Sequence, residues 1–91
     1  MNRDVIGEGV RDVLRFVLVG LSGTVARYLY YPEGRDGASG SVEFDMSTGR
    51  FEVTDESPDD YRSYYANHLR SRLSGVSSQD ELPRKGIVAW Y

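Results

Sequence analysis

The chain has 91 residues, enough for a single domain over residues 1–91 but too few for two hydrophobic cores. A hydrophobic share of 40% and a charged share of 27% are typical of globular proteins, and the formal net charge of -3 gives no overall attraction to nucleic acids or anionic membranes. The absence of cysteine excludes disulfides, thiolate catalysis, iron–sulfur clusters and cysteine-based zinc sites, and a single histidine excludes an all-histidine metal site within one chain.

The sequence shows no pattern that targets a membrane or the secretory pathway. Its longest apolar stretch, residues 13–21, contains Arg15 and is less than half of the roughly 20 residues that span a bilayer. A secretory signal needs a basic start, an apolar stretch and a small-residue cleavage site, whereas the start of this chain contains Asp4, Glu8 and Asp12 instead. We expect a cytoplasmic protein with no membrane partner.

The first predicted element is a helix over residues 10–21, with a buried strand over residues 14–19 as the alternative. The helix follows from an apolar stripe at i, i+3, i+4, i+7, i+8 and i+11, formed by Val10, Val13, Leu14, Val17, Leu18 and Leu21. The strand follows from residues 16–19, Phe-Val-Leu-Val, which are rich in β-formers. Gly20 and Gly23 are suited to end either element.

Three strands are expected next. Residues 24–31 are dense in β-branched and aromatic side chains and stop before Pro32, and residues 33–40 form a glycine-rich loop. Residues 42–46 and 50–53 then alternate between apolar and charged side chains, which indicates one buried and one exposed face. The segment 47–49, Ser-Thr-Gly, fits a hairpin turn between them.

A helix is predicted from Ser57 to about Ser74. Ser57 and Pro58 are typical of a helix start, and Gly75 is placed to end the helix. Four apolar or aromatic residues repeat along one face, namely Tyr61, Tyr65, Leu69 and Leu73. The polar segment 76–85 is expected to be a loop.

The last segment, residues 86–91, is apolar throughout, which predicts a strand that is covered on both faces and inserted among earlier strands, or covered by another helix or subunit. The order is therefore helix, three strands, helix, strand. We expect an α+β fold, with a four-stranded, mostly antiparallel sheet and two helices.

Two stretches carry a resemblance to known proteins: residues 30–34, Tyr-Tyr-Pro-Glu-Gly, and residues 82–91, which end in Val-Ala-Trp-Tyr. With Ser-Thr-Gly-Arg at 47–50 and Tyr-Ala-Asn-His at 65–68, residues 24–91 resemble small bacterial proteins of unassigned function that end in a Val-Ala-Trp-Tyr-like sequence. The resemblance implies a bacterial protein that is complete at Tyr91 and whose last residues are part of its structure. It implies no catalytic residue.

No catalytic, cofactor or metal site is predicted. His68 is the one side chain suited to proton transfer near neutral pH, but no nucleophile or second acid–base group stands at a catalytic spacing from it. We interpret His68 as a half-buried residue on a helix face. Five carboxylates between residues 52 and 60 lack the EF-hand spacing, so we interpret them as a solvated helix start.

Exposed aromatic residues give the clearest indication of an interaction surface. Tyr28 and Tyr30 share one side of their strand, opposite Leu29 and Tyr31, so one of the two pairs faces outward unless both faces are covered. The predicted interaction residues combine aromatic residues with the acidic turn: Tyr28, Tyr30, Trp90, Tyr91, Asp55, Glu56, Asp59 and Asp60.

We therefore expect a non-enzymatic protein that acts by protein–protein contact or self-association. An immunity or antitoxin-like role is one member of that class. The alternative is a nucleic-acid-binding accessory protein that uses exposed tyrosines and scattered arginines, namely Arg27, Arg35, Arg50, Arg62, Arg70 and Arg72.

Overall fold

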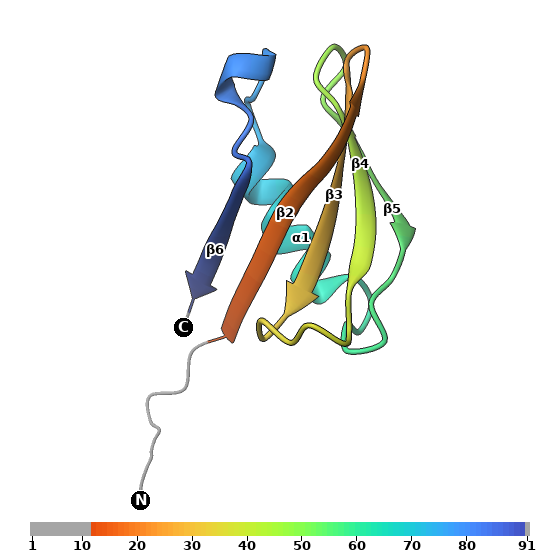
Figure 1. Ribbon diagram of the computed structural model, residues 1–91, viewed down its shortest axis with the longest axis vertical. Coiled ribbons are helices and arrows are strands. Elements are labelled where there is room, and N and C mark those ends of the chain that lie inside the picture. Colours follow the sequence, from red (N-terminus) through yellow and green to blue (C-terminus); the bar gives the residue numbers. More distant parts are fainter. Residues whose placement is uncertain (1–11, 91) are drawn as a thin grey trace, which may run out of the picture.

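The structure, a computed structural model, describes residues 12–90, which form an antiparallel sheet with one helix packed on one of its faces (Figure 1). In chain order the elements are β2 (Asp12–Ser22), β3 (Val25–Pro32), β4 (Gly40–Asp45), β5 (Arg50–Asp55), α1 (Tyr64–Leu73), the 3-10 turn η1 (Gln79–Glu81) and β6 (Lys85–Trp90). The sheet has five strands in the order β5-β4-β3-β2-β6. The prediction of four strands and two helices is therefore wrong.

The predicted helix over residues 10–21 is the first correction, because residues 12–22 form the strand β2. Residues 10 and 11 lie outside the described part of the chain. Along β2 the side chains of Leu14 and Phe16 are buried, while Val13, Arg15 and Val17 alternate with them on the opposite face. Since both faces of the strand carry apolar residues, the same sequence also fits the helical stripe.

The β2–β3 and β4–β5 hairpins lie side by side and form four of the five strands of the sheet. The register of β2 against β3 shifts between Leu18 and Gly20, so Val19 stands in a bulge. The predicted hairpin of residues 42–53 is confirmed, with β4 and β5 antiparallel and Gly49 at a φ of 77° in the turn.

The second helix prediction was right about the element but wrong about its start. α1 begins at Tyr64, and residues 57–63 form turns in which Arg62 and Ser63 adopt φ values of 54° and 58°. The Ser57 side chain donates a hydrogen bond to the carbonyl of Ala38 and is thus held by the β3–β4 loop. It accepts the amide of Asp59 at 3.1 Å and caps this turn, not α1.

The last strand was predicted to be inserted among earlier strands or covered by another helix or subunit, and the insertion is wrong. β6 lies at one margin of the sheet and pairs only with β2 among the described strands (Figure 1). Ile87 and Ala89 are exposed on the face that carries no helix. The apolar run therefore gives β6 apolar side chains on a face that no other described residue of this chain covers.

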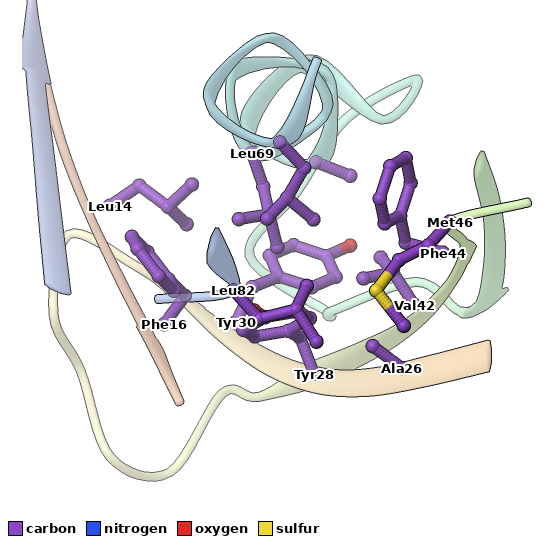
Figure 2. Close-up of a cluster of buried hydrophobic side chains, with 12 residues drawn as sticks. Leu14, Phe16, Ala26, Tyr28, Tyr30, Val42, Phe44, Met46, Leu69 and Leu82 are labelled. Carbon is purple, nitrogen blue, oxygen red and sulfur yellow. The ribbon is translucent and has the colours of Figure 1, made fainter. Parts of the chain in front are cut away.

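The hydrophobic core fills the space between the sheet and α1 (Figure 2). The sheet contributes Phe16, Tyr28 and Val42, and the helix contributes Leu69 and Leu73, all of them at most 1% exposed. The ring of Phe16 packs edge-on against Tyr28 with centroids 5.8 Å apart. The core thus lies on one face of the sheet and leaves the opposite face uncovered by the described residues.

Candidate functional site

The acidic turn contributes one residue to the interior and three to the surface. Asp60 is 9% exposed, and its carboxylate accepts the amides of Tyr65 at 2.8 Å and Ala66 at 3.2 Å. These amides belong to the first turn of α1, so Asp60 is the side chain that caps the helix. Asp55, Glu56 and Asp59 are exposed.

Two of the exposed carboxylates also have local partners. Glu56 accepts the backbone amide of Ser63 at 2.6 Å, and Asp59 lies 3.3 Å from the guanidinium of Arg35. Within the described residues, no group of three or more histidine or carboxylate side chains could hold a metal ion. The turn therefore holds the start of α1, and its outer carboxylates remain accessible to a partner.

Tyr28 and Tyr30, two of the predicted interaction residues, do not face outward, because both are 0% exposed. The Tyr30 hydroxyl donates to Asp60 at 2.9 Å and accepts the amide of Ser57 at 3.0 Å. The Tyr28 hydroxyl donates to the carbonyl of Pro83 at 2.7 Å. Burial raises the pKa of Tyr28 to about 12 and raises that of Tyr30 still further, so both hydroxyls stay protonated donors. These tyrosines hold the fold together and are not available to a partner.

Trp90 faces α1 and packs into an aromatic cluster with Tyr64, Tyr65 and His68. Its indole stacks on the His68 ring with centroids 3.5 Å apart and donates a hydrogen bond to the Tyr64 hydroxyl at 2.9 Å. The cluster attaches the edge strand β6 to α1 and leaves Tyr64 47% exposed. Tyr91, the remaining predicted interaction residue, lies outside the described residues.

The arginines proposed for nucleic-acid contact do not gather on one surface. The guanidinium of Arg27 lies 3.5 Å from the Glu43 carboxylate, and that of Arg50 lies 3.5 Å from the Glu52 carboxylate. Arg35 pairs with Asp59, as described above. The other three stand on α1 or just before it, with Arg70 and Arg72 in its last turn and Arg62 over the ring of Tyr61. Since acidic partners neutralise half of the set and Tyr28 and Tyr30 are buried, this arrangement does not resemble a basic, stacking nucleic-acid surface.

The uncovered face of the sheet carries a contiguous group of apolar side chains where β6, β2 and β3 lie side by side. The strand register places Val13 opposite Ala89, and Val17 opposite Leu29. Arg15 stands between Tyr31 and Ile87 in the next row, with its guanidinium 4.0 Å above the Tyr31 ring and paired with Asp36. We name this group the apolar strip, which consists of Val13, Val17, Leu29, Tyr31, Ile87 and Ala89.

Every side chain of the apolar strip is at least partly exposed, and Ile87 reaches 67%. Sequence reasoning missed the strip because it assigned the outward position to Tyr28 and Tyr30. The signal that could have found it was the lack of alternation in β2 and β6, which was interpreted as a helical stripe in β2 and as burial on both faces in β6.

Among the residues that the structure describes, no helix is long and apolar enough to cross a bilayer. No protein-family model, curated protein or solved structure matches the chain. The apolar strip is therefore the feature from which the function of this protein has to be inferred.

Proposed function

We propose that this protein acts by binding another protein through the apolar strip and carries out no chemistry of its own. The observation that supports the proposal is the strip itself, a set of apolar side chains on three adjacent strands with no covering element among residues 12–90. Contiguous exposed apolar patches on small proteins commonly mark interaction sites. The proposed role is that of a cytoplasmic bacterial interaction protein.

Two basic side chains share the face of the strip. Arg15 stands in its middle, between Tyr31 and Ile87, and Lys85 stands at its margin, opposite Val17. The Arg15 guanidinium is held between the Tyr31 ring and the Asp36 carboxylate, so it is already oriented before a partner arrives. Asp55, at the end of β5, and Glu56 and Asp59, which follow it, lie apart from the strip and form a secondary acidic patch for a basic partner, as an immunity or antitoxin-like role would require.

Affinity capture from a lysate of the native host, with and without nuclease, tests this proposal. The variant Leu29→Lys places a charge on the β3 side of the strip, and Val19→Lys is the control, because Val19 is a 49% exposed apolar residue of β2 outside the strip. We expect a nuclease-resistant protein partner that Leu29→Lys reduces at least about tenfold and Val19→Lys retains. Equal capture by both variants, or capture that nuclease abolishes, would reject the proposal.

A further inference from the structure

We propose that β6 pairs antiparallel with β6 of a second copy of this chain, across a two-fold axis at Ile87. The two sheets then join into one, and the two apolar strips become a single face. This inference rests on the proposed function, because the second copy binds at the β6 margin of the same strip. Three features support the inference. They are the difference between the two edges of the sheet, the outward direction of backbone hydrogen-bonding groups in β6, and the charge pattern of β6.

The two edges of the sheet differ in how they are protected. The edge strand β5 exposes Arg50, Glu52 and Asp55, and charges on an edge strand are a common means of preventing pairing with another chain. The opposite edge strand, β6, has one charged residue, Lys85, at its first position, followed by Gly-Ile-Val-Ala-Trp. The β6 edge therefore lacks the protection that β5 has.

The backbone of β6 presents hydrogen-bonding groups away from the sheet. The amide of Leu18 donates to the carbonyl of Arg84 at 2.7 Å, which makes these two residues a hydrogen-bonded pair of β2 and β6. Because bonded and non-bonded pairs alternate along an antiparallel ladder, Gly86 and Val88 direct their backbone groups to β2. Ile87 and Ala89 consequently direct theirs to the free edge.

The proposed register joins these outward groups without opposing like charges. An axis at Ile87 pairs this residue with Ile87 of the second copy, and it pairs Lys85 with Ala89 of the second copy on either side. The two Lys85 side chains then stand at opposite ends of the new ladder, about 13 Å apart along the strands. Ile87 from each copy packs side by side at the axis, where the strip is most exposed.

The edge strand is held in a defined position before pairing. On its inner face Trp90 stacks on His68, and Gly86 lies so close to Phe16 that an added Cβ would stand 2.8 Å from the ring. Since α1 and β2 anchor both ends of β6, little ordering of the strand is needed when the second copy binds. A preorganised edge favours pairing over an edge that must first become ordered.

Symmetric cross-linking tests the register directly, because the chain contains no cysteine. Two residues opposite each other in a bonded antiparallel pair have Cα atoms about 5.5 Å apart, which a disulfide can bridge. Under mild oxidation we expect Ile87→Cys to form a covalent dimer at least about tenfold faster than Val19→Cys, whose position is also exposed but lies outside the pairing. Equal rates for the two variants would overturn the register.

The oligomeric state and amide exchange of the unmodified chain test the pairing itself. In sedimentation velocity we expect a species of twice the 10.3 kDa monomer mass, and slower hydrogen exchange at Ile87 and Ala89 as the concentration rises. Ala89→Pro removes an outward N–H that β2 does not use, and should yield a folded monomer. A monomer at all concentrations, or a dimer in which these amides remain unprotected, overturns the inference.

Leu29→Lys separates this inference from the proposed function, because Leu29 lies two strands away from the β6 edge. We expect Leu29→Lys to remain a dimer, and loss of the dimer in this variant would contradict edge pairing. If the unmodified chain is monomeric while Leu29→Lys still abolishes capture of a partner, the second copy is rejected and the proposed function stands.

Discussion

Asp60 is the residue that links the sheet to the helix. One carboxylate accepts the Tyr30 hydroxyl from β3 and the amides of Tyr65 and Ala66 from α1. Two of these hydrogen bonds are buried and the one from Tyr65 is partly buried, so removing the carboxylate would leave three donors without their acceptor. The acidic turn thus contains one carboxylate that the fold requires, next to carboxylates that it does not.

Asp60→Ala should therefore destabilise the protein far more than Asp59→Ala. We expect a loss of about 2–3 kcal/mol in the free energy of unfolding for Asp60→Ala, from the lost helix cap and the unsatisfied donors. The Asp59 side chain pairs with Arg35 at the surface, so its removal should cost less than about 1 kcal/mol. Urea denaturation measures both values, and similar losses would contradict this assignment.

Asp45 predicts a pH dependence of stability. Hydrogen bonds from the Ser47 hydroxyl, the Thr24 hydroxyl and the Ser47 amide lower the pKa of this carboxyl below its usual value in the folded protein. A lowered folded-state pKa contributes stability that is present above the unfolded-state pKa and is lost as the pH falls through the folded one.

We therefore expect the free energy of unfolding to decrease more steeply below about pH 4 in the unmodified protein than in Asp45→Asn. Urea denaturation at a series of pH values from neutral to acidic gives the two slopes. Parallel curves for the two proteins would show that Asp45 makes no such contribution.

At the scale of elements, the β3–β4 connection depends on the small size of Gly40. A Cβ at this position would lie 2.5 Å from the backbone nitrogen of Ser57 and 2.6 Å from the carbonyl oxygen of Asp55. Both are backbone atoms, so neither can move aside as the end of a side chain would. The close approach lets the turn before α1 pack directly on the start of β4.

Gly40→Ala should destabilise the fold by about 2–3 kcal/mol through this clash. Gly37→Ala is the matched control in the same connection, since an added Cβ there meets nothing within 4 Å. We expect the control to be neutral or stabilising by up to about 1 kcal/mol, because alanine restricts the unfolded chain. Thermal unfolding of the two variants would contradict the argument if their midpoints shifted equally.

The elements differ in how well the sequence could predict them, and the difference follows from their surroundings. The hairpin of β4 and β5 alternates strictly because only one of its faces is buried, so its period of two is visible. In β2, apolar residues on both faces removed the alternation and produced a helical spacing by coincidence. The start of α1 was displaced because Ser57 is held by Ala38, a contact between residues far apart in the sequence.

At the scale of the whole molecule, the position of each strand in the sheet determines its local stability. β3 pairs with strands on both sides and carries the fully buried Tyr28 and Tyr30. β5 pairs on one side, and most of its side chains are exposed. We expect the amides of β3 to exchange with solvent more slowly than those of β5, as native-state hydrogen exchange would measure. Equal protection of the two strands would contradict this order.

The arrangement of strands could not be obtained from sequence patterns. Local composition and alternation identified the segments of β3, β4, β5 and β6, but strand order depends on pairing between distant segments, such as Val17 with Lys85. Without that order, an apolar strand such as β6 reads as an interior strand although it lies at an edge. The sequence also did not show which face of β3 is covered by α1, because alternation separates the two faces without ranking them. For this reason Tyr28 and Tyr30 were named as interaction residues although they are buried.

The pairing of β2 with β6 also bears on how the chain folds during synthesis. The ribosome delivers β2 first among the described strands and β6 last, so the edge of β2 that β6 covers stays bare while all the intervening residues are made. The aromatic contacts between Trp90 and α1 likewise wait for the final strand. Folding of the sheet is therefore completed only after residue 90 has left the exit tunnel, and nascent chains have an open strand edge until then.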